Sequence, residues 1–192
     1  SWYGYVPATG TEDNLSSRWA NAKNTKDGSY FVWIPRYAYR ITYYSDPEYK
    51  NMTGFYDGCG MWNAVDGVLN YKIDEGIETA EYNGNKYIVH PAFVNNVENG
   101  GWDTELTGIW VSKFEMSRES ATLESAGTMT ETKFRSVPNV QSAGYIRIKD
   151  MFTYSIQYDE QKESHMMKNS EYGVVAYLAQ SQYGRNGNEI DY

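Results

Sequence analysis

Few residues in this chain have the types and spacing that enzymatic chemistry requires. The two histidines, His90 and His165, lie far apart, and neither has a second metal-ligating residue three or four positions away, the spacing that places ligands on one face of a helix. His90 ends an apolar, β-branched segment just before Pro91, and His165 precedes a predicted helix. We therefore expect a hydrogen-bonded structural role for both rings rather than a role as ligand or base.

Cys59 is the only cysteine, so no disulfide can form within the chain. It lies between Gly58 and Gly60, with no sequence neighbour that would lower its thiol pKa, as a nucleophile requires. We expect a small buried or incidental cysteine. The Gly-x-Ser-x-Gly, P-loop and Gly-x-Gly-x-x-Gly motifs are absent, which argues against the commonest hydrolases, nucleoside triphosphatases and dinucleotide-binding enzymes. Paired carboxylates for glycoside cleavage stay open, because 25 acidic residues always offer pairs.

Two acidic segments, Asp46-Pro47-Glu48 and Glu98 to Asp103, could offer oxygen ligands to calcium. Neither matches the loop of an EF-hand, and we favour solvated acidic loops. The sequence therefore predicts no cofactor, with calcium as the open alternative. It also predicts no catalytic residues, and we expect a protein that is not an enzyme.

Composition and charge narrow the class of protein. A content of 41% hydrophobic residues supplies enough apolar surface for a core, and 192 residues suit a single domain over 1–192. The net charge of −8 repels phosphate backbones, so we expect no nucleic-acid partner. No apolar run approaches the roughly 20 residues that cross a bilayer, so we expect no membrane insertion. From Ser1 and the Gly/Asn stretch before Tyr192 we expect a fragment of a longer chain.

Short strands are the first elements that would position any site. The aromatic and β-branched segment Tyr30–Tyr44 predicts a strand. Pro35 within it predicts an edge strand or a break into two pieces, because proline has no N–H. Thr79–Tyr82 and Asn85–His90, joined by Asn83-Gly84, predict a hairpin with a type I′ turn.

Other segments give weaker signals. Residues 45 to 78 are rich in Gly, Asp, Asn and Tyr, and we expect a long irregular insertion with at most one short strand, near Val68–Ile73. Apolar and polar residues alternate from Gly108 to Met116, which predicts a half-buried strand. Ser16 or Ser17 could cap a short helix that runs to Ala22.

Two main helices are predicted in the second half of the chain. Ile146–Tyr158 carries apolar residues at three- and four-residue spacing, among them Ile148 and Phe152. A second helix over 170–183 has Ser170 as its predicted N-cap and Gly184 after its end. Its predicted core-facing residues are Tyr172, Val175, Ala176, Ala179 and Tyr183. The fold class is therefore α+β, with short antiparallel strands, two main helices and long irregular loops.

Tyrosine is in excess, with 19 residues, and many Asn, Ser and Gly residues accompany it. This is the composition of recognition surfaces, where rigid aromatic rings make contacts at a small entropy cost. Periodicity places Tyr37 and Tyr39 in or near the core, whereas core packing does not obviously require the tyrosines between residues 43 and 71. The predicted binding residues are Tyr43, Tyr44, Tyr49, Tyr56, Trp62 and Tyr71.

Four segments together resemble a known family. They are Phe31–Tyr37 (FVWIPRY), Gly108–Glu115 (GIWVSKFE), Val137–Val140 (VPNV) and Met167–Leu178 (MKNSEYGVVAYL). Their order is similar to that in the formylglycine-generating-enzyme-like, or sulfatase-modifying-factor-like, branch of the C-type-lectin fold. The amino-acid sequence is also similar to domains of gut Firmicutes and their phages. The resemblance implies a C-type-lectin-like fold.

The departures from that family bear on function. Its enzymes use a pair of late cysteines, and related sulfoxide synthases use a His-rich iron site; this chain has neither. The family segment that completes the sheet and often holds calcium would lie beyond Tyr192. The resemblance therefore implies the scaffold without the active residues.

Three hypotheses follow. The first is an extracellular, non-enzymatic recognition domain of a phage virion or bacterial surface appendage, an adhesin that binds a surface glycan or protein through Tyr/Asn-rich loops. The second is a structural or decorating subunit of a virion or filament, whose aromatic residues are buried against neighbouring subunits. The third is an oxidoreductase of the formylglycine-generating type, which would depend on Cys59.

Overall fold

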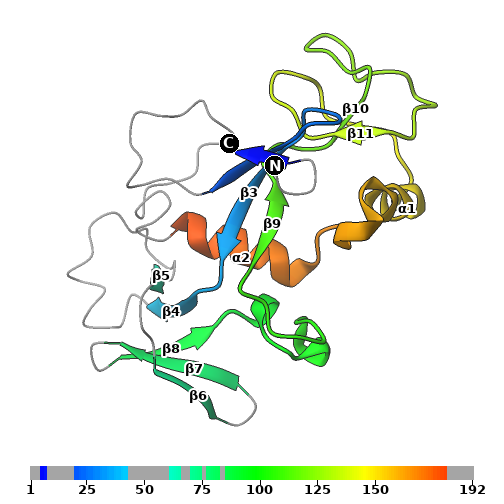
Figure 1. Cartoon of the computed structure of the whole chain (residues 1–192). Coiled ribbons are helices and arrows are strands. Elements are labelled where there is room, and N and C mark those ends of the chain that lie inside the picture. The colour runs from blue at the N-terminus through cyan, green and yellow to red at the C-terminus, as the bar shows by residue number, and fades with distance from the viewer. Residues whose placement is uncertain are drawn as a thin grey trace. The chain divides into compact units, whose positions relative to one another are not determined.

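A computed structural model of the chain describes residues 5–7, 20–42, 61–65, 70–74, 77–82 and 85–180. Among these residues the fold is mixed α+β, with two α-helices and small antiparallel sheets, as the sequence predicts. The chain divides into two compact units: unit 1 is Ser1–Ile34 with Trp110–Met167, and unit 2 is Pro35–Ile109 with Lys168–Tyr192. Each unit is thus built from two segments that are distant in sequence (Figure 1). That 1–192 is a single domain stays a prediction.

The main sheet of unit 1 has the strand order β1-β2-β3-β9. Its strands are β1 (Tyr5–Pro7), β2 (Asn21–Asn24), β3 (Tyr30–Pro35) and β9 (Gly108–Ser112). β2 pairs antiparallel with both β1 and β3, so the helix predicted after Ser16 or Ser17 does not extend to Ala22; residues 16–19 lie outside the described residues. Pairing on both sides satisfies the backbone groups of β2, and this gain overrides a weak local helix signal.

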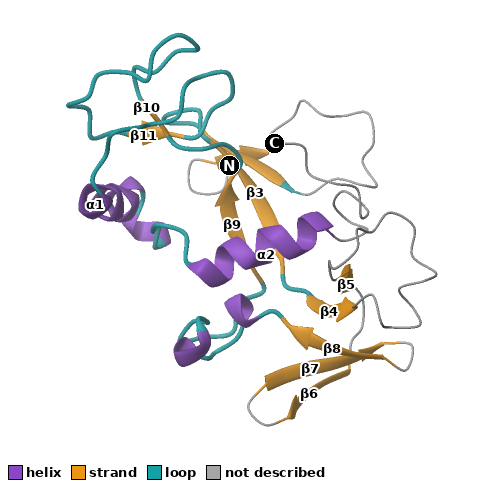
Figure 2. Ribbon diagram, turned by 180° about the vertical axis from the view of Figure 1, so that it is seen from behind, coloured by secondary structure: helices purple, strands orange, loops and turns teal. Residues whose placement is uncertain are grey.

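A second, two-stranded sheet of unit 1 anchors a long loop (Figure 2). Its strands are β10 (Ser117–Arg118) and β11 (Phe134–Arg135), which pair antiparallel. Arg118 is only 1% exposed, and its guanidinium donates to the carbonyl of Ala126 at 3.3 Å and to that of Gly144 at 2.8 Å. The buried arginine therefore fastens the loop to the strand through backbone oxygens. The strand predicted to run to Met116 ends at Ser112, where the chain turns towards this sheet.

α1 (Ile148–Tyr158) is anchored to unit 1 by aromatic residues on one of its faces. The ring of Tyr154 stacks on Phe134 with 5.2 Å between centroids, and Tyr158 lies 5.9 Å from Phe31. The hydroxyl of Tyr158 also accepts a hydrogen bond from Asn24 Nδ2 at 3.0 Å. A short 3₁₀ helix, η5 (Glu160–Lys162), follows α1.

The sheet of unit 2 has the strand order β5-β4-β8-β7-β6. Its strands are β4 (Ala38–Thr42), β5 (Met61–Val65), β6 (Asn70–Asp74), β7 (Ile77–Tyr82) and β8 (Asn85–Val89). β7 and β8 form the predicted hairpin, with Tyr82 opposite Asn85; the turn at Asn83-Gly84 lies outside the described residues. In the segment expected to be a largely irregular insertion, β6 corresponds to the one short strand predicted near Val68–Ile73. β5 and the start of β7 were not predicted, because pairing can hold strands whose sequences show little alternation.

Pro35 breaks the predicted strand as expected, since β3 ends there and β4 begins at Ala38. Arg36, directly after the break, forms an ion pair with Glu105 at 2.5 Å and donates to the carbonyl of Phe93 at 2.8 Å. These bonds hold a long connection in unit 2 that contains two 3₁₀ helices, η3 (Pro91–Phe93) and η4 (Val97–Asn99).

α2 (Asn169–Gln180) is the helix of unit 2. Its buried residues are Glu171, Val174 and Leu178. Of the predicted core-facing residues, Tyr172 is 65% exposed, so its assignment was wrong, whereas Val175, Ala176 and Ala179 are half-buried. Tyr183 lies outside the described residues. A carboxylate lies on the buried face because Glu171 accepts a hydrogen bond from the backbone N–H of Lys168 at 2.8 Å, one half of a capping box. Ser170 is not the N-cap, since it lies inside the first turn and donates to the carbonyl of Gly100 at 2.6 Å.

Candidate interaction surface

The predicted binding residues are only partly described. Tyr43, Tyr44, Tyr49 and Tyr56 lie outside the described residues. Trp62 lies in β5 and Tyr71 in β6, which are the two opposite edge strands of the five-stranded sheet. At about 4.8 Å between neighbouring strands, these edges are about 19 Å apart. The structure therefore does not bring these two positions together.

The register also puts positions 62 and 71 on opposite faces of that sheet. Position 62 is opposite Ile41 and position 64 opposite Tyr39, so position 62 shares a face with Tyr39. Position 71 is opposite Ala80, which is opposite Tyr87. Tyr87 belongs to the buried cluster with Ala38 and Val89. The role of the predicted residues in binding stays a prediction, and positions 62 and 71 lie on opposite faces of the sheet.

His90 lies in a buried aromatic cluster of unit 2, in the structural role predicted for it. It is 2% exposed, its Nδ1 accepts from the N–H of Ala92 at 3.2 Å at the start of η3, and its ring lies 5.4 Å from that of Tyr39 and 5.2 Å from that of Tyr177. Burial lowers the pKa of His90 to about 4. The ring is therefore neutral at pH 7.

Tyr37 completes this cluster from the other side. Its hydroxyl donates to the carbonyl of Val174 at 2.6 Å, and its ring lies 5.6 Å from that of Phe93. Burial, with neighbouring tyrosines, raises the pKa of Tyr37 well above the ordinary value. The perturbed pKa values of this cluster all follow from burial. Of the tyrosines predicted to belong to the core, Tyr37 is buried and Tyr39 half-buried, whereas Tyr172 is exposed and Tyr183 lies outside the described residues.

The described residues contain no group of three or more histidine, cysteine, aspartate or glutamate side chains that could hold a metal ion. The segment from Glu98 to Asp103 falls in that described part, whereas Asp46-Pro47-Glu48 and Cys59 lie outside it. In the same part of the chain, no helix has the length and apolar character to cross a membrane.

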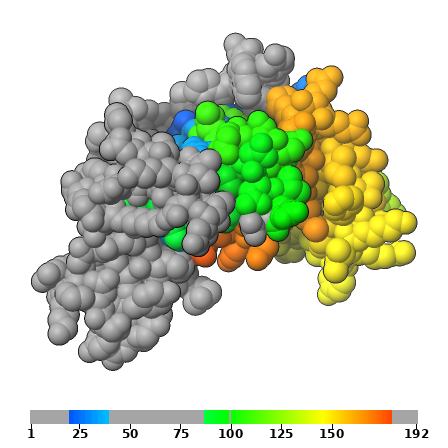
Figure 3. Space-filling model, turned by 90° about the horizontal axis from the view of Figure 1, so that it is seen from below, coloured from blue at the N-terminus to red at the C-terminus, as the bar shows by residue number. Residues whose placement is uncertain are grey.

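The outer face of α1 carries three exposed large apolar residues. Ile148 is 75% exposed, Phe152 54% and Ile156 36%. These residues lie at i, i+4 and i+8, so they form one stripe along the helix. We call this set of three residues the outer stripe. Figure 3 shows the yellow to orange segment that contains α1 at the molecular surface.

Sequence analysis predicted the helix but not the exposure of its outer stripe. The sequence contains a sign of this exposure, because one short helix carries two apolar faces. One face is the outer stripe, and the other carries Tyr154 and Tyr158, which pack on the sheets of unit 1. A helix that docks on one surface can bury only one such face. The two tyrosines occupy that surface, and no residue of α1 is fully buried.

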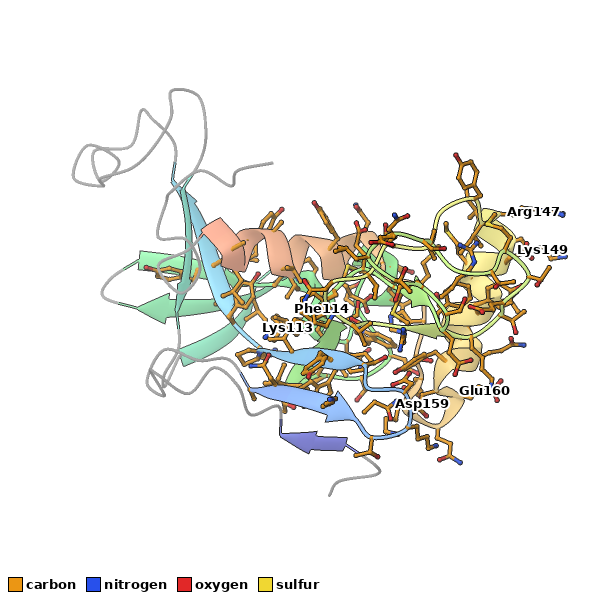
Figure 4. The ribbon with its side chains drawn as sticks, turned by 90° about the horizontal axis from the view of Figure 1, so that it is seen from above. Lys113, Phe114, Arg147, Lys149, Asp159 and Glu160 are labelled. Atoms are coloured by element: carbon orange, nitrogen blue, oxygen red, sulfur yellow. The ribbon has the colours of Figure 1, made fainter. Side chains whose placement is uncertain are left out.

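Charged residues of opposite sign stand at the two ends of the outer stripe. Arg147 and Lys149, both exposed, flank Ile148, whereas exposed Glu160 and Glu163 follow the end of the helix. Figure 4 shows Arg147 and Lys149 at one end of α1 and Glu160 at the other. Arg147 forms a long ion pair with Asp150, 3.9 Å between Nε and Oδ2, and its side chain is 92% exposed. Because an exposed ion pair of this kind contributes little, Arg147 can exchange it for a contact with a partner.

Trp33 and Trp110 form a second half-exposed aromatic feature of unit 1. They lie on the neighbouring strands β3 and β9, with ring centroids 5.3 Å apart, and Trp110 is 39% exposed. Rings carried on paired strands lose little entropy on binding, because the backbone already fixes them.

No family model, no curated protein and no solved structure matches the chain. The resemblance to the formylglycine-generating-enzyme-like branch of the C-type-lectin fold stays a prediction.

Proposed function

We propose that the chain is a non-enzymatic recognition domain whose contact surface includes the outer stripe of α1. One observation carries this proposal: three large apolar side chains stand in line and exposed on a helix whose other face is already anchored. The exposed part of these side chains contributes little to their own fold. Burial against a partner would gain up to about 1.5–3 kcal/mol for each, and contiguous apolar patches mark interaction sites.

The stripe favours a protein surface over a glycan as the partner. Isoleucine and phenylalanine have no hydrogen-bonding groups for sugar hydroxyls, whereas protein interfaces place such side chains at their centre, inside a polar rim. Arg147 and Glu160 at the ends of the stripe would belong to that rim. The proposed setting, a phage virion or bacterial surface appendage with a C-type-lectin-like scaffold, rests on the family resemblance alone.

The test is binding of the fluorescently labelled 192-residue chain to intact bacterial cells of several Firmicutes, compared between the wild type and Phe152→Ser. We expect saturable binding that Phe152→Ser weakens at least about tenfold, in line with the loss of a central aromatic contact. Leu123→Ser is the matched control, since Leu123 is an exposed apolar residue, 71% exposed, outside the stripe. Equal losses for both variants, or no binding to any cell, would overturn the proposal.

A surface glycan is the second candidate ligand, favoured by the Trp33–Trp110 pair. Sugar rings stack on exposed indole faces, and the predicted Tyr/Asn-rich segment between residues 43 and 71 would supply further contacts. Titration with glycans should quench tryptophan fluorescence, and Trp110→Ala should abolish this response while Trp102→Phe leaves it intact. If a Cys59-dependent turnover of a cysteine-containing peptide were measured instead, both binding proposals would give way to the oxidoreductase alternative.

A further inference from the structure

We infer that the outer stripe of α1 pairs with the outer stripe of a second copy of this chain, with the two helices antiparallel about a twofold axis at Phe152. This inference deepens the proposed function, since it names one partner for the same surface. It rests on the spacing of the three apolar residues and on the charges at the two ends of the helix.

The spacing is symmetric about its centre. Ile148 precedes Phe152 by four residues, and Ile156 follows it by four. On an antiparallel partner helix centred on Phe152, Ile148 of one copy lies opposite Ile156 of the other, and the two Phe152 rings meet on the axis. A self-complementary contact of this kind is what a twofold, isologous interface requires.

The charges at the helix ends select the antiparallel orientation. At the N-terminal end, Arg147 and Lys149 outnumber Asp150, which pairs with Arg147. Beyond the C-terminal end, Glu160 and Glu163 are exposed, and the charge of Lys162 is balanced by its ion pair with Asp159. The two ends are therefore net basic and net acidic. Antiparallel pairing brings the basic end of each copy to the acidic end of the other. In a parallel pair, like charges would meet at both ends, which opposes association.

The positions of the charged residues along the helix also suit antiparallel pairing. With Phe152 on the axis, Arg147 lies level with Gln157 of the second copy, three residues short of Glu160. Glu160 begins η5, directly after Asp159 at the end of α1, and two long side chains can span a short offset between them. Each dimer would contain this charge pair twice. The helix has only 11 residues, so the interface is smaller than the standard interface of about 1,600 Å², and we expect a weak, concentration-dependent dimer.

Sedimentation velocity of the full chain, over about a hundredfold range of concentration, tests the association. The wild type should change from monomer to dimer. Phe152→Ser should weaken the dimer at least about tenfold, because it removes two rings at the centre of the contact. Leu123→Ser, the matched exposed apolar control, should leave it unchanged. A wild type that stays monomeric throughout, or a dimer insensitive to Phe152→Ser, would overturn the inference.

Charge variants test the orientation without touching the packed face of α1. Arg147→Glu alone should weaken the dimer about three- to tenfold, and the double variant Arg147→Glu/Glu160→Arg should restore it to within about twofold, because the pair is remade with reversed signs. Both side chains are exposed, so misfolding does not account for a loss. A double variant weaker than the single one would exclude the antiparallel pairing.

Disulfide trapping gives a second, geometric test of orientation. In a C59A background, a mixture of I148C and I156C chains should cross-link faster than either variant alone. In an antiparallel pair, residue 148 of one copy and residue 148 of the other would lie about 12 Å apart along the axis, at 1.5 Å per residue. This distance is beyond the roughly 7 Å that a disulfide permits between Cα atoms. Faster cross-linking of I148C with itself would show a parallel pair and overturn the inference.

Two outcomes separate this inference from the proposed function. If the chain stays monomeric while Phe152→Ser still abolishes binding to cells, the stripe recognises a different protein and only the inference fails. If vesicles of phosphatidylglycerol and phosphatidylcholine bind the wild type and not Phe152→Ser, the occupant is a lipid surface, and both proposals fail.

Discussion

The two helices differ sharply in where they place their apolar residues. α2, in unit 2, has 12 residues and buries Val174 and Leu178 with an inward carboxylate. α1, in unit 1, has 11 residues and no fully buried one, although it carries aromatic side chains on one face and the outer stripe on the other. Amphipathic spacing therefore predicts that a helix forms, but not which of its apolar residues face the core.

The largest effect that sharpens this contrast should come from Leu178→Ala. Leu178 is 6% exposed in α2, and truncating a buried leucine destabilises a protein by about 2–5 kcal/mol, according to how far the cavity collapses. Chemical denaturation monitored by circular dichroism measures the free energy of unfolding. A loss below about 0.5 kcal/mol, the range of ordinary surface changes, would mean that α2 does not pack as described.

The second effect is a pH dependence from His90, whose ring packs beside Tyr177 of α2. Its pKa is about 4 in the folded protein and 6.5 in the unfolded chain. Between these values the unfolded state takes up the proton and the folded state does not. The free energy of unfolding therefore falls as the pH drops from 6.5 towards 4, by a contribution on the order of 3 kcal/mol that is fully present above pH 6.5.

The free energy of unfolding, measured against pH for the wild type and for His90→Asn, gives this contribution as the difference between the two curves. The carboxylates that titrate in the same range affect both curves alike. Asparagine keeps an acceptor for the N–H of Ala92 and carries no titrating ring. The matched control is His165→Asn, since His165 is only half-buried. If the His90→Asn curve kept the full slope of the wild type between pH 6.5 and 4, His90 would not be buried in its neutral form.

A smaller effect should come from Glu171→Ala, which removes the acceptor for the N–H of Lys168 at the start of α2. Loss of a cap of this kind costs about 0.5–2 kcal/mol. Glu171→Gln retains an acceptor and should recover most of the loss. Denaturation midpoints of the two variants, compared at pH 7, check the assignment. Equal midpoints would assign the effect to the other interactions of this buried side chain.

The smallest effect on stability should come from Ile148→Ser in α1, within about 0.5 kcal/mol, because the side chain is 75% exposed and makes no core contact to lose. The measurement belongs at low concentration, where association does not contribute. A loss comparable to that of Leu178→Ala would remove the contrast between the helices, since it would mean that Ile148 is buried within its own chain.

The sequence predicted best those elements whose local signals agree with their tertiary surroundings. The Asn83-Gly84 signal and the flanking β-branched residues predicted the β7–β8 hairpin, and the missing N–H of Pro35 predicted the break between β3 and β4. The short strand expected near Val68–Ile73 corresponds to β6, but β5 was missed, because pairing with β4, rather than alternation within its own segment, determines it.

The faces of the helices were harder to predict than the helices themselves. Tyr172 was assigned to the core because tyrosine is apolar enough to fit the stripe, yet Glu171 takes the inward position through its hydrogen bond to the backbone. α1 has two apolar faces, and only one of them can pack against the sheets of unit 1. Only the contacts of Tyr154 and Tyr158 decide between them, and these depend on strands distant in sequence.

The interleaving of the two units has a consequence for synthesis on the ribosome. The chain enters unit 1, leaves for unit 2, returns to unit 1 and ends in unit 2. β3 emerges long before its partner β9. Tyr37 likewise emerges long before Val174, whose carbonyl accepts the hydrogen bond from the Tyr37 hydroxyl. Neither unit can fold completely from its first segment alone, because each also needs a segment that is translated later. The nascent chain therefore exposes the unpaired edge of β3 until β9, at Gly108–Ser112, is made, which is the stage at which chaperones would act.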